Sequence, residues 1–213
     1  GVLAGHSIVY LFNRLPAEWL CDYGEEPSEE LKHPTEQRIK GYPWKLTLSG
    51  LFICIAINLV IYDWQYCAAA MVYSWSLAMI FAADKKYGII PDQFVLLTAA
   101  SALGFIPFFD SVMDHLYGMA AGAGVMLTAA LLGKLLYRKE TLGFGDVKLF
   151  AAIGLAIGLK GTIVVLIMSS LAAAGVFSVQ LIRRKIKRDD MIPLGPYICG
   201  AAIFYVVIIC PLL

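Results

Sequence analysis

The chain has 213 residues, of which 60% are hydrophobic, and its formal net charge is +1. Soluble domains are usually about 45–50% apolar, so the composition argues against a soluble protein and predicts a polytopic membrane protein. The basic residues flank apolar runs and do not line one face, so nothing indicates nucleic-acid binding. One helical bundle spanning residues 1–213 is the expected domain organisation.

About eight apolar runs follow one another along the chain, and a spanning helix needs about 20 such residues. The predicted spans are 2–12, 46–62, 64–83, from the polar turn at 89–92 to about 109, about 112–137, 147–159, about 162–182, and from the segment 193–196 to 213. A polar loop at about 13–45 separates the first two. The predicted fold is therefore all-α, with about eight transmembrane helices in the lipid bilayer.

The placement of Lys and Arg predicts the orientation of these spans. Alternate loops, within residues 14–45, 85–86, 134–148 and 183–188, hold nearly all the basic residues, whereas the opposite loops hold only Lys160. Basic loops face the cytoplasm, so both chain ends are expected outside. This orientation puts Asp84, Asp92 and Asp146 on the cytoplasmic side of the cell membrane.

A polar turn at 142–148 lies between two long apolar runs. Gly143 and Gly145 can adopt backbone conformations closed to other residues, and they leave no side-chain bulk near Asp146. A helix is expected to begin near Val147, and its first N–H groups would favour the charged carboxylate. The simpler alternative is a turn with a helix-capping aspartate.

The apolar run 147–159 is short for a transmembrane span. Thirteen residues extend about 20 Å, against a hydrocarbon core of about 30 Å. Irregular backbone below the membrane surface is tolerated only in buried or water-lined places, so Asp146 is expected in a water-filled recess. A carboxylate at that depth indicates a functional site.

Asp84 ends the third predicted span, and it could face the same recess as Asp146. Two carboxylates that share a site do not both ionise easily, so one keeps its proton near neutral pH. Such a pair suits peptide hydrolysis, because one member takes a proton from water and the other polarises the carbonyl. The alternative for Asp84 is an interfacial charge paired with Lys85 or Lys86.

Two further residues near the aspartates have structural interpretations. Asp92 follows Pro91 at a helix start, which favours a capping role. Lys148 is either a snorkelling anchor or the partner that keeps Asp146 ionised. The cysteines form no Cys-x-x-Cys pair and no P-loop occurs, so no metal and no cofactor are expected.

These residues resemble the motifs of the type IV prepilin peptidases. The Asp-x7-Asp pattern from Asp84 to Asp92 is similar to the first aspartate motif of that family, and Gly-Phe-Gly-Asp-Val-Lys at 143–148 is similar to the second. Ile-Pro-Leu-Gly-Pro-Tyr at 192–197 resembles the Pro-Phe-Gly-Pro-Tyr segment of the family. Gly5 with Arg-Leu-Pro at 14–16 resembles its N-terminal signature.

The resemblance implies a Gly-x-Gly-Asp aspartic protease of the membrane, with Asp84 and Asp146 as the catalytic pair. The other motif residues, Gly143, Gly145, Lys148 and Asp92, would support the pair or contact substrate. The implied partners are the N-terminal leaders of prepilins and pseudopilins, which family members cut on the cytoplasmic side after a glycine that follows a short basic leader.

The chain also departs from the family pattern. Many bacterial members carry two Cys-x-x-Cys pairs in the first cytoplasmic loop, but the loop at about 13–45 has only Cys21, and Leu46 stands where the family has a glutamate. We therefore expect leader cleavage without N-methyl transfer. The alternative function is a proton-coupled membrane transporter, since paired intramembrane carboxylates also relay protons.

Overall fold

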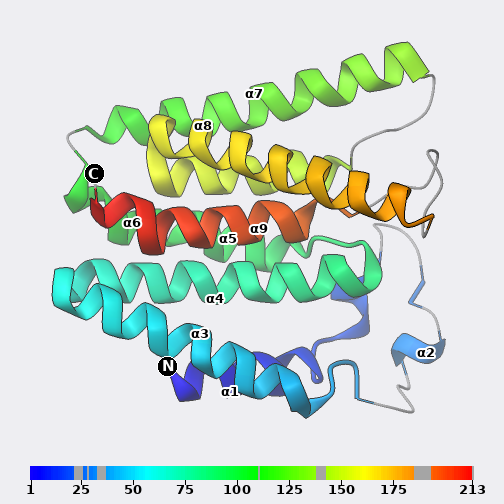
Figure 1. Ribbon diagram of the computed structural model, residues 1–213, viewed down its shortest axis with the longest axis horizontal. Coiled ribbons are helices and arrows are strands. Elements are labelled where there is room, and N and C mark those ends of the chain that lie inside the picture. The colour runs from blue at the N-terminus through cyan, green and yellow to red at the C-terminus, as the bar shows by residue number, and fades with distance from the viewer. Residues whose placement is uncertain are drawn as a thin grey trace.

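The computed structural model describes residues 1–21, 26–27, 29–32, 37–109, 111–137, 143–184 and 193–212 (Figure 1). Within these ranges the chain is helical and contains no strand, which confirms the predicted all-α class. The longer helices are α1 (Val2–Phe12), α3 (Gly41–Tyr62), α4 (Trp64–Tyr87), α5 (Asp92–Ala100), α7 (Val112–Tyr137), α8 (Phe144–Ile182) and α9 (Gly195–Phe204). The short elements are η1 (Ala17–Leu20), α2 (Glu29–Lys32), α6 (Ala102–Phe105), η2 (Ile106–Phe108), the π-helical η3 (Tyr205–Ile209) and η4 (Cys210–Leu212).

Several of these helices have the length and composition of membrane spans. Among the described residues, three are long and apolar enough to cross a membrane: α4, the Val112–Leu136 part of α7, and α8. Four shorter apolar helices are Val2–Phe12, Gly41–Ile57, Asp92–Phe108 and Gly195–Ile209. The protein is therefore a helical membrane protein, while the number of about eight spans stays a prediction.

The element α8 is two helices joined at a break. Gly158 has φ +70° and ψ −178°, a conformation that favours glycine. A Cβ on Gly122 of α7 would lie 2.5 Å from the Phe150 carbonyl oxygen and 3.3 Å from Thr162 Cγ2. In one straight helix, Phe150 and Thr162 would be about 18 Å apart. The two halves of α8 therefore run back alongside each other, as the separate predicted spans 147–159 and 162–182 require.

Helix α4 lies at the centre of the bundle and contacts α1, α3, α5, α6 and α9. Its composition is apolar on all sides, which is expected for a buried helix. The Tyr73 ring, fully buried, packs edge-on against Phe105 at a centroid distance of 5.7 Å. Asp63 caps the start of α4 by accepting hydrogen bonds from two backbone N–H groups. Gly88, with φ +69°, ends it, and its N–H donates to the Asp84 carbonyl oxygen at 2.9 Å.

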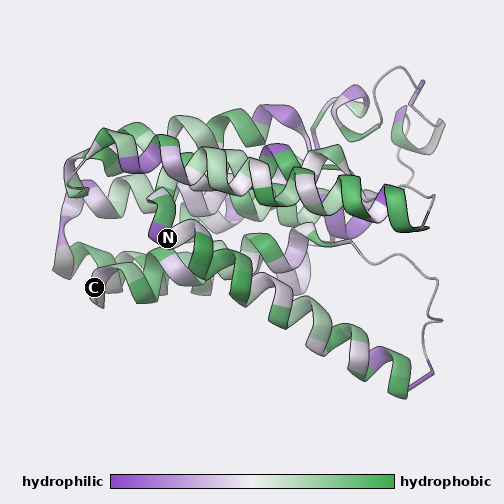
Figure 2. Ribbon diagram, turned by 90° about the horizontal axis from the view of Figure 1, so that it is seen from above, coloured by the Kyte–Doolittle hydropathy of each residue, from purple (hydrophilic) through white to green (hydrophobic). Residues whose placement is uncertain are grey.

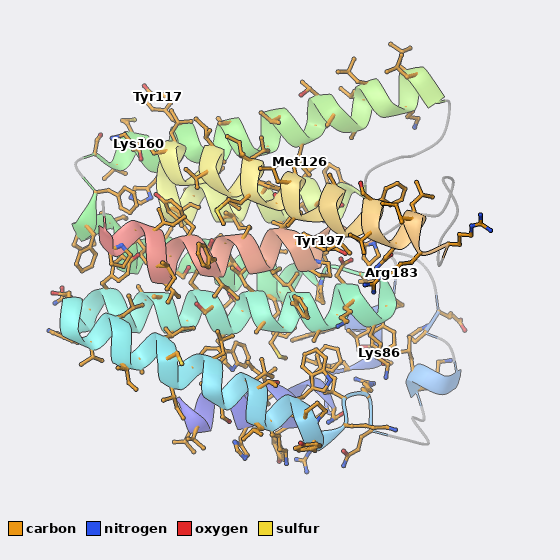
Figure 3. The ribbon with its side chains drawn as sticks, viewed as in Figure 1. Lys86, Tyr117, Met126, Lys160, Arg183 and Tyr197 are labelled. Carbon is orange, nitrogen blue, oxygen red and sulfur yellow. The ribbon has the colours of Figure 1, made fainter. Side chains whose placement is uncertain are left out.

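The C-terminal ends of several helices, where loops follow in the chain, lie at one end of the bundle. Figure 1 shows the C-terminal ends of α1, α4, α7 and α8 at the same end. The helices are mostly hydrophobic along their lengths, with hydrophilic residues toward the ends (Figure 2). In Figure 3, Lys86 and Arg183 lie at this loop-bearing end, whereas Lys160 lies at the opposite end. This arrangement agrees with the separation of basic loops in the sequence.

Candidate active site

A cavity of about 460 Å³ lies at the loop-bearing end, where the end of α4 meets the starts of α5 and α8. Its lining consists of Glu18, Trp19, Cys21, Asp84, residues 88–93, Gly143, Phe144, Gly145, Asp146 and Lys148. All the residues that the sequence singled out as site candidates line this one cavity. Leu142 and Ile192, which belong to the motif segments, lie outside the described residues, as does part of the loop at about 13–45.

Asp84 lies on the last turn of α4 and is only 5% exposed. Its Oδ2 atom is buried and has no hydrogen-bond partner in the described part of the chain. Gly195, the first residue of α9, lies against the carboxylate: a Cβ there would be 2.6 Å from Asp84 Oδ2. In the sequence, Gly195 stands out only as part of the motif at 192–197. Its position between Leu194 and Pro196, at the start of an apolar run, was the available signal.

Asp146 lies in the first turn of α8. The helix begins at Phe144, not near Val147, and Gly143 is its N-cap. The Asp146 N–H donates to the Gly143 carbonyl oxygen at 3.1 Å. A Cβ on Gly143 would be 3.6 Å from Asp146 Oδ2, so the carboxylate folds back over this glycine.

Neither Gly143 nor Gly145 adopts a backbone conformation that is closed to other residues. Gly143 has φ −71° and ψ 142°, which any residue adopts, and Gly145 is helical. Gly145 is favoured because it lacks a side chain: a Cβ there would lie 3.1 Å from Ile90 Cβ. The start of α8 thereby packs closely against the segment that leads into α5.

The two carboxylates reach the cavity from different helices. The alternative partners of Asp84 are engaged elsewhere. Lys86 Nζ donates to the Arg38 carbonyl oxygen at 2.6 Å, and Lys85 Nζ lies 5.5 Å from the Trp44 ring centre. In the described ranges neither lysine forms a salt bridge with Asp84. Two carboxylates in one cavity are suited to sharing a single proton.

Lys148 pairs with Asp92, a contact that neither sequence interpretation of Lys148 included. Its Nζ lies 3.1 Å and 3.0 Å from the two carboxylate oxygens, and the side chains are 33% and 30% exposed. Asp92 lies in the first turn of α5, as predicted, but Pro91 is the N-cap. Asp92 therefore joins α5 to α8 at the cavity wall, besides its place at the helix start.

Within the described residues, no group of three or more His, Cys, Asp or Glu side chains is placed to hold a metal ion.

Residues 71–179, which include both aspartates, match the model of the type IV leader peptidase family. The chain belongs to this family. It is 32% identical over 170 residues to a protein of Xanthomonas campestris pv. campestris named prepilin leader peptidase/N-methyltransferase, covering 77% of this chain and 58% of that protein. A protein of the same name from Aeromonas hydrophila is 30% identical over 162 residues, covering 75% and 56%.

The chain thus spans somewhat more than half the length of these type IV leader peptidase relatives. No solved structure gives a significant match to it. The family match does not support the proton-coupled transporter that paired carboxylates also allow.

Proposed function

We propose that this protein is a membrane aspartic endopeptidase that removes the N-terminal leader of prepilins or pseudopilins. The observation that carries the proposal is the meeting of Asp84 and Asp146 in one cavity, in a chain of the type IV leader peptidase family. The relatives' printed names add the substrate class.

The two aspartates would perform hydrolysis with one proton between them. The ionised carboxylate takes a proton from a water molecule as the water oxygen attacks the scissile carbonyl carbon. The protonated carboxylate donates a hydrogen bond to the carbonyl oxygen, where negative charge develops. When the C–N bond breaks, the leaving amine takes up one proton from the aspartate pair. The pair then holds a single proton again, as it did before the reaction.

The other cavity residues would position the substrate. Gly143 and Gly145 line the cavity beside Asp146, and the Lys148–Asp92 pair fixes one wall. The carboxylates of Glu18 and the three aspartates outnumber the single lysine in the lining. An acidic cavity complements the short basic leader that the family cuts, and charge complementarity of this kind favours encounter and register.

The proposed location is the cytoplasmic membrane, with the cavity on the cytoplasmic side. The support is the bias of Lys and Arg toward the loop-bearing end, where the cavity lies (Figure 3). The proposed unit is one transmembrane peptidase domain, and the proposal covers leader cleavage alone. Cys21 remains the single cysteine of the loop at about 13–45.

The test is cleavage of a purified prepilin by the purified protein in detergent. Asp84→Asn and Asp146→Asn should each reduce the cleavage rate by about 10²–10⁴-fold, because each removes an acid–base group. Both variants should unfold at the wild-type temperature within a few degrees, since the amide keeps the shape of the side chain. Near-normal processing by either folded variant would rule out the pair.

A further inference from the structure

A second cavity, distinct from the acidic one, opens on the side of the bundle. This lateral groove has a volume of about 500 Å³; α3 and the α9–η3 segment form its walls, and Ala78 and Phe81 of α4 form its floor. Figure 1 shows α4 between α3 and α9. Apart from Thr47, the lining side chains are apolar, and none carries a charge. The lateral groove is therefore suited to bind a hydrocarbon chain.

The lateral groove has the depth of one membrane leaflet. On α3 it runs from Trp44 to Ile55, eleven residues along the helix, or about 16 Å. One leaflet of a hydrocarbon core of about 30 Å is about 15 Å thick. An acyl chain that lies in the groove from Trp44 inward would therefore reach the bilayer midplane.

A basic pocket lies at the loop-bearing end of the lateral groove. Its volume is about 370 Å³, Arg38, Lys40, Lys85 and Lys86 line it, and none of its described lining residues is acidic. Trp44 lines both this basic pocket and the lateral groove. The two cavities are thus parts of one surface, positively charged at the end and apolar along the side.

Lys85 lies at the junction of the two cavities. Its Nζ is 5.5 Å from the ring centres of both Trp44 and Phe81, which line the lateral groove, while the side chain lines the basic pocket. The side chains of Arg38 and Lys86 also form hydrogen bonds to the backbone of the loop before α3. Arg38 donates to the Leu31 carbonyl oxygen, and Lys86 donates to the Arg38 carbonyl oxygen. Lys40 and Lys85 are therefore the positions to change without loosening the loop.

We propose that the basic pocket and the lateral groove together bind one anionic glycerophospholipid from the leaflet on the loop-bearing side. The phosphate would lie among Lys40, Lys85 and Lys86, and an acyl chain would lie along α3 toward Ile55. Basic pockets between membrane helices bind anionic headgroups in this way. A basic peptide leader would be repelled by the same cations. The proposal does not rest on peptidase activity, because neither cavity includes Asp84 or Asp146.

The headgroup half of the proposal is tested by native mass spectrometry of the purified protein. Phosphatidylglycerol and phosphatidylcholine with the same acyl chains are titrated separately. The wild type should bind one phosphatidylglycerol at least tenfold more tightly than phosphatidylcholine. Lys40→Gln/Lys85→Gln should weaken phosphatidylglycerol binding by about 25-fold, at about fivefold per lysine, and leave phosphatidylcholine binding unchanged. The control Arg183→Gln/Arg184→Gln removes the same charge at the same end, outside the pocket, and should change neither affinity.

The acyl-chain half is tested by filling the lateral groove. Gly200 lines it, and a Cβ there meets nothing within 4 Å, so Gly200→Leu enters the groove without a backbone clash. This variant should weaken phosphatidylglycerol binding at least tenfold. Gly175→Leu, on α8 outside the groove and equally open, is the control and should bind as the wild type does. If Gly200→Leu does not fold, Cys54→Trp fills the groove from the opposite wall.

Several outcomes would overturn the proposal. Equal binding of the two lipids by the wild type, or wild-type binding by the lysine variant, removes the anion site. Wild-type binding by the groove variants removes the acyl-chain site. Displacement of the lipid by glycerol 3-phosphate at matched concentration would make the pocket a site for soluble anions. A lipid-free dimer that Gly200→Leu dissociates would assign the groove to a second copy of the chain.

Discussion

At the scale of single residues, Gly195 decides where the Asp84 carboxylate can lie. A Cβ at this position would be 2.6 Å from Asp84 Oδ2, well inside van der Waals contact. Gly195→Ala should therefore displace the Asp84 carboxylate from its position in the cavity. A displacement of about 1 Å in a catalytic group can cost about 10²-fold in rate, and we expect a loss of that size in prepilin cleavage.

The control for this prediction is Gly175→Ala, another glycine on a helix, where a Cβ meets nothing within 4 Å. It should cleave at the wild-type rate. The two alanine variants are compared in detergent for rate and for thermal unfolding. Wild-type cleavage by a folded Gly195→Ala protein would show that the carboxylate has room to move without loss of function.

Asp92 is the third aspartate of the cavity, and its contact with Lys148 separates it from the proposed pair. Partly exposed ion pairs contribute about 0–1 kcal/mol to stability, whereas a catalytic acid or base contributes about 10²–10⁴-fold in rate. We predict that Asp92→Asn keeps cleavage within about tenfold of the wild type. Rates of Asp84→Asn, Asp92→Asn and Asp146→Asn on one prepilin would test this. An inactive Asp92→Asn beside an active Asp84→Asn would make Asp92 and Asp146 the pair.

The sequence predicted several of the residues that line the cavity, but it did not predict which of them contact one another. Asp84 and Asp146 were expected in one recess because each lies at the end of an apolar run on the same side of the membrane. The contacts of Gly195 with Asp84 and of Lys148 with Asp92 were not expected. Both join residues from helices far apart in the chain, and sequence spacing carries no information on such distances.

At the scale of helices, small residues set how closely α7 approaches α8. A Cβ on Gly118 would clash with the Gly154 carbonyl oxygen, and one on Gly154 with that of Gly118. Without a hydrophobic driving force in lipid, close packing of small residues is a main source of helix association. This contact holds α7 against the first half of α8, the half that carries Asp146.

We predict that Gly118→Ala destabilises the protein by about 1–3 kcal/mol, the usual cost of forcing an extra carbon into a packed contact. Thermal unfolding in one detergent is the measurement. Gly124→Ala is the matched control on the same helix, because its Cβ would meet nothing within 4 Å. An equal unfolding temperature for both variants would mean that α7 shifts freely along α8.

The helix ends show where sequence patterns lose precision. The two halves of α8 were predicted as separate apolar runs because Lys160 interrupts the hydrophobic pattern, but the break lies at Gly158, inside the predicted run 147–159. The start of α8 was placed three residues too late, near Val147 and not at Phe144. Two glycines in four residues suggest a turn by local propensity, but packing of Gly145 against Ile90 favours the helix.

At the scale of the whole molecule, the acidic cavity and the basic pocket lie at one end of the bundle, and Lys160 lies at the other (Figure 3). In the proposed orientation, substrate leaders and lipid headgroups would both be met on the cytoplasmic side.

The last prediction tests this orientation with single cysteines at opposite ends. The chain has five native cysteines, none in a disulfide within the described residues, so a variant with all five replaced by alanine is the background. In spheroplasts, a membrane-impermeant maleimide should label Lys160→Cys and leave Arg183→Cys unlabelled. After the membrane is opened with detergent, both should react, which shows that Arg183→Cys is accessible in itself. The reverse pattern would put the aspartate cavity on the outer face, where it could not meet a cytoplasmic leader, and would contradict both the orientation and the proposed peptidase function.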